Sequence, residues 1–261
     1  MKHTLLATII AAFSVSALAN SFHNQTDGNF GWIDTDAGDY QQWNLSHRFY
    51  LTPVTPGNKA PFDEAGFLSR SSSLTGGYNY MKFDAAATEY SVSAWTLGGE
   101  YKDVSHNFYA AANVIEINGS ADSAALISAG YFLQRDWLVK LDARHLRPDG
   151  EGSYTEYGVS TKKLLALENG NFINIEANFM DVREQDASEF GVAADYYFGR
   201  SIALGLTYDW VSDDVVTADA DSFSVRGSWY VQSNLALRAA VVFDADYSDE
   251  EMYQLGASYR F

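Results

Sequence analysis

The sequence predicts an all-β protein, an antiparallel up-and-down transmembrane β-barrel of about 14 strands. Three observations predict this fold. Apolar and polar residues alternate with a period of two in many segments, tight turns alternate with longer acidic connections, and the chain ends in an alternating segment whose last residue is aromatic. Each is typical of a sheet with one face in lipid and the other in water.

The alternation is clear from residue 137 onward. There Trp137, Val139 and Leu141 lie on one face of an extended chain, whereas Lys140 and Asp142 lie on the other. The same pattern occurs in residues 173–179, 202–210, 222–229, 235–244 and 253–261. We expect each apolar set to face lipid and each polar set to face a lumen.

Tight turns predict the number of strands. Turn-like sequence follows Tyr131, Tyr197 and Tyr230, which are 66 and 33 residues apart. Moving toward the N-terminus in steps of about 33 residues reaches three more turn-like stretches, 167–171, 102–105 and 69–72. Such a repeat fits a β-hairpin with one turn and one loop. Six turns separate seven hairpins, which predicts 14 strands.

One connection does not fit this scheme. Residues 51–68 contain three of the four prolines and are long for a tight turn. They are a partly folded turn, a segment tucked into the lumen, or a sign that the first hairpin is drawn wrongly. The last reading leaves 12 strands as the alternative.

The connections at the opposite end are longer and acidic. They comprise residues 34–39, 148–152, 181–189, 212–221 and 244–251. Long loops at one end of a barrel and short turns at the other are the pattern of outer-membrane barrels, whose loops face outside.

The start of the chain reads as a secretory signal peptide. Lys2 precedes an apolar run over residues 5–15, and Ala17-Leu18-Ala19 places small residues before a cleavage site at Asn20. The apolar run is too short for a membrane anchor, since a spanning helix needs about 20 residues. We expect residues 1–19 to be removed and residues 20–261 to form a single barrel domain.

Composition excludes several classes of protein. The formal net charge is −17, which argues against a nucleic-acid binder because such proteins need basic surface. There is no cysteine, so no disulfide stabilises the exported chain. The mean hydropathy of −0.20 is that of a soluble protein, but strands with one apolar and one polar face average to such values.

The C-terminal strand, residues 253–261, resembles the assembly signal of Gram-negative outer-membrane barrels, in which Tyr259 and Phe261 would be read by the β-barrel assembly machinery. With the signal peptide, the hairpin series and the acidic loops, the mature chain resembles the smaller outer-membrane porins of Gram-negative bacteria. The resemblance implies export to the outer membrane and contact with its lipid and lipopolysaccharide. It also implies passive diffusion of ions and small hydrophilic solutes, by a monomer or a homo-oligomer. The chain is shorter than the general trimeric porins, and no long loop is evident that would fold inward as their constriction.

Charged residues on the polar faces are the expected lining of the lumen. They are Lys140, Asp142, Arg144, Glu176, Asp195, Asp209, Arg226, Arg238 and Arg260. In a wet pore they tune ion selectivity, whereas in a closed barrel they pair as a structural network. About 14 strands favour a narrow wet pore, because about eight strands fill with side chains and 16–18 leave an aqueous channel. Acidic loops at the mouth predict a weak preference for cations.

No motif predicts an enzyme, a cofactor or a metal. The chain has no G-x-S-x-G and no H-E-x-x-H sequence. Asp244, Asp246 and Ser248 are spaced as at the start of an EF-hand loop, but Asp249 and Leu255 break the pattern. The alternatives to a porin are a plugged structural or adhesion barrel and, less well supported, a barrel enzyme acting on lipid or peptide.

Overall fold

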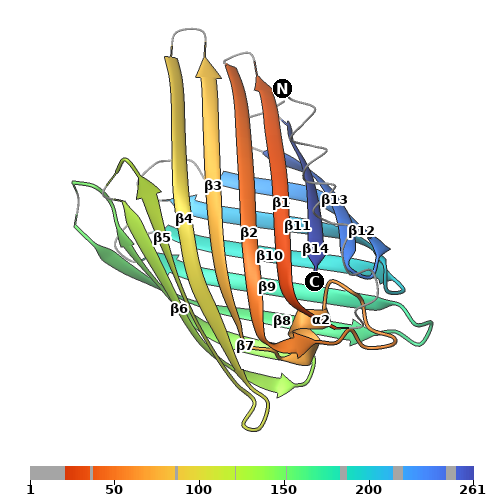
Figure 1. Ribbon diagram of the computed structural model, residues 1–261. Helices are drawn as coiled ribbons and strands as arrows, with labels where there is room; N and C mark the ends of the chain where they lie inside the picture. The colour runs from red at the N-terminus through yellow and green to blue at the C-terminus, as the bar shows by residue number, and fades with distance from the viewer. Residues whose placement is uncertain are drawn as a thin grey trace.

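A computed structural model shows a closed barrel of 14 antiparallel strands, in which each strand pairs with its neighbours in the chain and β1 pairs with β14 (Figure 1). The structure describes residues 21–35, 38–85, 88–120, 122–150, 152–182, 187–213, 220–244 and 251–261. The strands are β1 (Phe22–Thr35), β2 (Gly38–Val54), β3 (Ser73–Ala85), β4 (Thr88–Asp103), β5 (Phe108–Asn118), β6 (Ser123–Gln134), β7 (Trp137–Arg147), β8 (Tyr154–Ala166), β9 (Phe172–Val182), β10 (Ala187–Phe198), β11 (Ile202–Asp213), β12 (Ala220–Gln232), β13 (Leu235–Asp244) and β14 (Glu251–Arg260). The predicted fold is confirmed, and the alternative of 12 strands is not needed.

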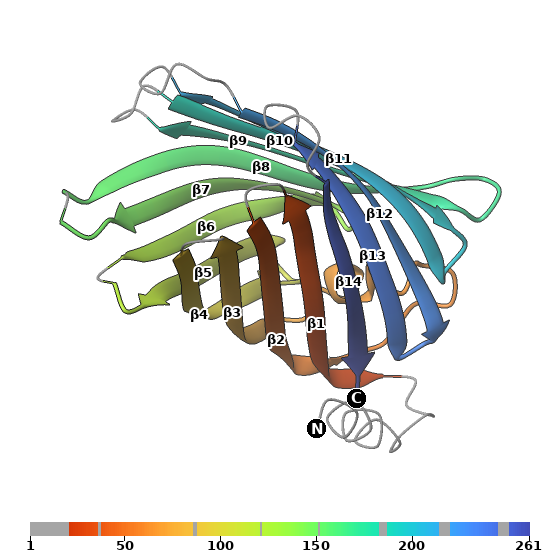
Figure 2. The ribbon, with the colours of Figure 1, turned by 90° about the horizontal axis from the view of Figure 1, so that it is seen from above.

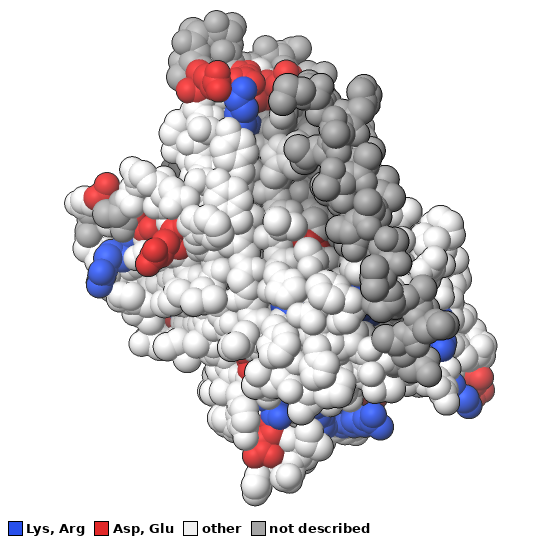
Figure 3. All heavy atoms as spheres, in the orientation of Figure 1, with Lys and Arg blue, Asp and Glu red and all other residues white. Residues whose placement is uncertain are grey.

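The polarity of the strands is that of a barrel in lipid. Large apolar side chains on the outer face are exposed, as for Leu141 (69%) and Ile127 (61%), whereas Phe132 (1%) and Leu138 (4%) on the other face are buried. Figure 3 shows charged side chains gathered at the ends of the strands, with a broad band of uncharged residues between them. A charged side chain at the middle of such a band would cost about 2–4 kcal/mol for Arg or Lys.

The two ends of the barrel differ in their connections. The end where β1 begins and β14 finishes, called here the turn end, has tight links such as residues 135–136, 199–201 and 233–234. The opposite end, the loop end, carries the acidic connections, of which 183–186, 214–219 and 245–250 lie outside the described residues, as does the predicted signal peptide.

The first acidic connection is shorter than expected. Residues 34–39 were predicted as a long loop, but β1 runs to Thr35 and β2 starts at Gly38, with these two residues paired across the hairpin. The prediction was wrong because aspartate is uncommon in strands, so the sequence of this stretch resembles a loop. In the structure, the pairing of β1 with β2 continues through this stretch in spite of its composition.

The connection between β2 and β3 is the exception at the turn end. Residues 55–72, called here the luminal segment, contain the five-residue helix α2 (Ala65–Ser69) and lie within the ring of strands (Figures 1 and 2). Of the three readings of this stretch, the structure shows a segment tucked into the lumen. Helix α2 is far too short to cross a membrane, and no described helix has the length and apolar character to do so.

Candidate functional site

The luminal segment separates the interior of the barrel from its turn end. Asp63, Glu64 and Phe67 line a cavity of about 570 Å³ on the lumen side. In contrast, Lys59 and Ser69 line a cavity of about 600 Å³ with residues of the turns and the ends of β8 and β9. The segment therefore lies across the interior of the barrel, between these two cavities.

Asp63 holds the segment to one wall of the barrel. Its carboxylate accepts hydrogen bonds from Ser228 Oγ (2.6 Å) and Tyr230 Oη (2.9 Å) on β12. It also pairs with Arg238 on β13, where Nη2 lies 3.0 Å from Asp63 Oδ1. Burial alone would raise the pKa of Asp63, but the charge of Arg238 and the hydrogen bond from Ser228 hold it below its ordinary value. Asp63 is therefore bound as a carboxylate.

Glu64, the next residue, holds the segment to a different part of the wall. Its carboxylate accepts a hydrogen bond from Tyr197 Oη on β10 (2.8 Å) and pairs with Lys162 Nζ on β8 (3.0 Å). Glu64 is 3% exposed. Burial raises the pKa of Glu64 even though the charge of Lys162 opposes the shift. Two consecutive acidic side chains thus tie the segment across the lumen.

The C-terminal end of the segment is held by Arg70. Its guanidinium donates to Asn107 Oδ1 (2.6 Å) and to the carbonyl of Gln134 (3.0 Å), and it lies 4.1 Å from the centre of the Phe132 ring. The backbone of Arg70 is left-handed, with φ at 52°, which costs an L-residue about 1–2 kcal/mol. The side-chain contacts of Arg70 offset that cost. The left-handed backbone of Arg70 is where α2 ends.

The N-terminal end is held by backbone contacts. The amide of Phe62 donates to the carbonyl of Arg200 (2.9 Å), and the carbonyl of Phe62 accepts from Arg260 Nη1 (2.7 Å). The guanidinium of Arg200 lies over the Phe62 ring at 4.3 Å.

Apolar contacts pack the middle of the segment against the wall. Ala65 is buried with Phe22, Tyr50 and Val54, and Phe67 packs against the cluster that contains Phe132. Gly66 is adjacent to the Tyr50 side chain, because a Cβ at this position would lie 2.7 Å from the Tyr50 hydroxyl. A residue larger than glycine would displace the segment or the tyrosine.

Three of the four arginines predicted to line the lumen, Arg226, Arg238 and Arg260, occupy the neighbouring strands β12, β13 and β14 and have different partners. Arg226 pairs with Asp195 through Nε (2.8 Å) and Nη2 (2.9 Å). Arg238 bridges Asp63 and Asp27, with 2.9 Å between Nη1 and Asp27 Oδ1. Arg260 is 2% exposed and donates to Gln25, so it belongs to the packed wall under the segment.

The other predicted lining residues lie on β7, β9 and β11. Lys140 and Asp142 line the lumen-side cavity of about 570 Å³, and Asp142 accepts hydrogen bonds from two serines on the adjacent strands. Glu176 pairs with Lys162, which Glu64 also contacts.

Two of this set lie apart from the luminal segment. Arg144 pairs with Glu156 and with Glu189 of β10. Asp209 is exposed, and the described residues give it no hydrogen bond or ion pair. The sequence prediction placed all of these side chains in one group, whereas the structure divides them between contacts to the segment and contacts within the wall.

Sequence reasoning missed Asp63, Glu64, Arg70 and Lys162. The available signal was the length and proline content of residues 51–68 and the adjacent acidic pair 63–64, at an end of the barrel where the other connections are tight. That signal locates an unusual segment but does not say which wall residues it meets.

The C-terminal strand closes the barrel. The carbonyl of Phe261 accepts from the amides of His23 (3.1 Å) and Asn24 (2.9 Å), and its amide donates to Asn24 (3.0 Å). Tyr259 is buried (7%), and its ring stacks with that of Phe261, which is 45% exposed. The two residues predicted as the assembly signal therefore also lie at the seam between β14 and β1.

The lumen provides charged groups of both signs. The lumen-side cavity of about 570 Å³ is lined by six basic and five acidic residues, and a smaller one, of about 310 Å³, by two of each. Among the described residues, no three His, Asp or Glu side chains gather as a metal site. The EF-hand-like stretch that begins at Asp244 lies partly outside the described residues.

Comparison with known proteins gives one family and several structures. Residues 1–261 match the family described as "Putative general bacterial porin". The outer-membrane protein Omp33 of Acinetobacter baumannii superposes with a TM-score of 0.73 at 17% identity, over 94% of this chain and 100% of that one. A bacterial polysaccharide outer-membrane secretin superposes with a TM-score of 0.53 at 8% identity, over 91% and 98% of the two chains. No curated protein matches the chain in sequence.

Proposed function

The chain belongs to the family of general bacterial porins, and we propose that it is an outer-membrane channel through which ions and small hydrophilic solutes diffuse passively. The observation that supports this most directly is a closed ring of 14 strands around cavities lined by charged side chains. Fourteen strands lie between the barrels that fill with side chains and those that leave a wide aqueous channel.

The luminal segment is the barrier in this proposal. It is tied to β8, β10, β12 and β13, so a solute passes only when the segment moves or through the space left beside it. In the membrane, the turn end faces the periplasm and the loop end faces the outside, by analogy with other outer-membrane barrels. The barrier is then on the periplasmic side.

We expect a weak preference for cations. The lumen-side cavity of about 570 Å³ has nearly balanced charge, so the lumen wall contributes little net selectivity. The acidic connections join the strands at the loop end, and we expect their charge to concentrate cations there and to be screened by salt.

The test is single-channel conductance of the refolded mature protein in a planar bilayer under a salt gradient. A second protein replaces residues 55–70 with a short Gly/Ser turn. This is feasible because the ends of the segment are adjacent, with 2.9 Å between Thr52 Oγ1 and Ser71 Oγ. We expect small or intermittent steps from the full chain and large ohmic steps from the shortened one, with a reversal potential that favours cations. A folded shortened protein that does not conduct would refute the channel.

The alternatives predict different outcomes. A structural or adhesion barrel predicts no conductance by the full chain under any condition. An enzyme acting on lipid or peptide needs a paired serine and histidine, but among the described residues His106 pairs with Asp103 and His145 with Thr155, and no serine hydroxyl bonds a histidine. The family and the fold point to a channel rather than an enzyme.

A further inference from the structure

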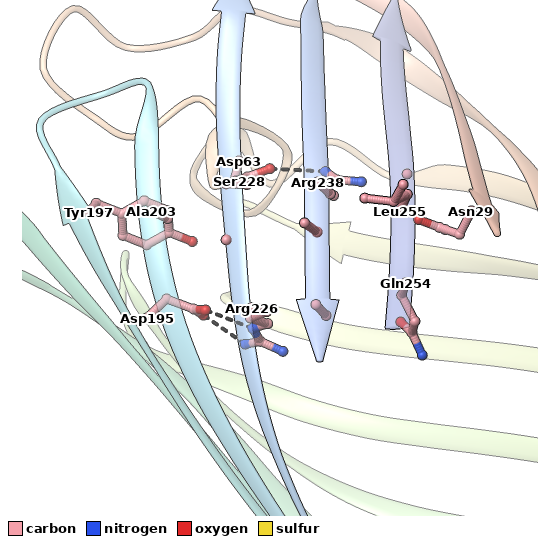
Figure 4. Close-up of a pocket in the computed structure, with 14 residues that line it drawn as sticks. Asn29, Asp63, Asp195, Tyr197, Ala203, Arg226, Ser228, Arg238, Gln254 and Leu255 are labelled. Carbon is pink, nitrogen blue, oxygen red and sulfur yellow. Dashed lines mark hydrogen bonds and ion pairs between the residues drawn. The ribbon is translucent and has the colours of Figure 1, made fainter. Parts of the chain in front are cut away.

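The smaller cavity, of about 310 Å³, contains acidic and basic side chains that differ in how many of their hydrogen-bonding atoms already have a partner. It is lined by Asp63 and Asp195 and by Arg226 and Arg238, together with uncharged residues of β10 to β14 and of β1 (Figure 4). Its volume of about 310 Å³ is at the small end of the range for ligand pockets, about 300–1,000 Å³.

The two carboxylates in this cavity are already bonded. Both oxygens of Asp195 accept from Arg226, and one also accepts from Asn174. One oxygen of Asp63 accepts from Ser228, and the other accepts from Tyr230 and Arg238. A cationic solute would therefore compete with these protein donors for the two carboxylates.

Arg226, in contrast, presents an unused donor to the cavity, whereas Arg238 uses both of its terminal nitrogens on Asp27 and Asp63. Arg226 bonds Asp195 through Nε and Nη2, and the described residues provide no partner for its Nη1, which points away from Asp195 (Figure 4). The Arg226 side chain is 40% exposed and Asp195 only 11%. Arg238 is likewise more exposed than Asp63, at 30% against 18%. The water-facing charge of the cavity is therefore positive.

The spacing of the two arginines suits one small ligand. Arg226 and Arg238 lie on adjacent strands, and Arg238 pairs in register with Ser228, two residues from Arg226. Diagonal neighbours of this kind lie about 7–8 Å apart on one face of a sheet, which is within the reach of two arginine side chains. Guanidinium groups prefer planar acceptors such as carboxylates, which they bind through two parallel hydrogen bonds.

We propose that this cavity binds a small solute through its carboxylate groups, at Arg226 and Arg238. A carboxylate on Arg238 replaces Asp63 there, and so it weakens the tie between the luminal segment and β13. This second step rests on the proposed function as a channel, whereas the binding step does not.

The binding step is tested on the folded full-length mature protein in detergent. The probe is succinate, with uncharged succinamide as the matched compound, and the readout is calorimetric titration. Arg226→Gln removes the free donor. Lys163→Gln removes the same charge outside the lumen, where Lys163 pairs with Asp136. We expect wild type and Lys163→Gln to bind succinate but not succinamide, and Arg226→Gln to bind at least tenfold more weakly. Equal binding by Arg226→Gln, or no binding by wild type, overturns the inference.

The opening step is tested in planar bilayers with sodium succinate against sodium chloride at equal ionic strength. We expect succinate to raise the open fraction of the wild-type channel several-fold and to have no such effect on Arg226→Gln. If the shortened protein conducts while wild type responds equally to both salts, the opening step is wrong and the channel stands. If wild type binds succinate through Arg226 but the shortened protein does not conduct, the channel is wrong and the binding site stands.

Discussion

The substitution Asp63→Asn should release the luminal segment from the wall that it contacts on β12 and β13. It removes the ion pair with Arg238, which is worth about 1.5–3 kcal/mol, and weakens one of the two hydrogen bonds that the hydroxyl groups of Ser228 and Tyr230 donate to the carboxylate, by about 1 kcal/mol. Because Asp63 and Arg238 are partly exposed, at 18% and 30%, the lower value applies to the ion pair. The sum is about 2.5 kcal/mol, which corresponds to about a 60-fold change in an equilibrium constant.

The assay is the open fraction of single channels in planar bilayers. If the bound segment closes the pore, Asp63→Asn should raise the ratio of open to closed time by about 60-fold, until the channel is open most of the time. Asp209→Asn is the matched control, since it removes one acidic charge from the wall without contact to the segment. Its open fraction should stay within about twofold of wild type. An Asp63→Asn protein that folds and keeps the wild-type open fraction would refute the assignment of the segment as the barrier.

Three further predictions concern the segment and the seam. The raised pKa of Glu64 means that its contribution to binding of the segment is full below the ordinary glutamate pKa of about 4.3 and is lost as pH rises through the raised value. Acidification from neutral pH through the raised pKa of Glu64 should therefore lower the open fraction of wild type, and Glu64→Gln, which keeps a neutral side chain beside Lys162, should be low and flat over the same range; a wild-type profile without any pH dependence would contradict this. Gly66→Ala should raise the open fraction several-fold, because its Cβ would lie 2.7 Å from the Tyr50 hydroxyl, and an unchanged open fraction would show that the tyrosine moves instead. Deleting Phe261 should reduce the fraction of heat-modifiable, folded barrel more than Phe261→Ala does, because only the deletion removes the backbone hydrogen bonds of the seam; equal losses would mean that the side chain alone matters.

The barrel itself was predictable because its determinants are local. Each strand must place apolar side chains toward lipid at every second position. The outward orientation of Trp137, Val139 and Leu141 can therefore be predicted from the local sequence alone, without knowing which distant residues they meet. Turns between such strands are also local, and their spacing led to the correct number of strands. The exception, the hairpin at residues 34–39, failed because its aspartates resemble a loop in composition while the ladder continues through them.

The luminal segment depended on contacts that no local pattern contains. Asp63 meets Arg238 across 175 residues of sequence, and Glu64 meets Tyr197 across 133. The sequence by itself determined a 14-stranded barrel with a charged interior and an unusual stretch near residue 60, since alternation and turn chemistry act between near neighbours. Only the tertiary structure decided that this stretch crosses the lumen and which charges hold it there, because closing the ring of strands brings those side chains together.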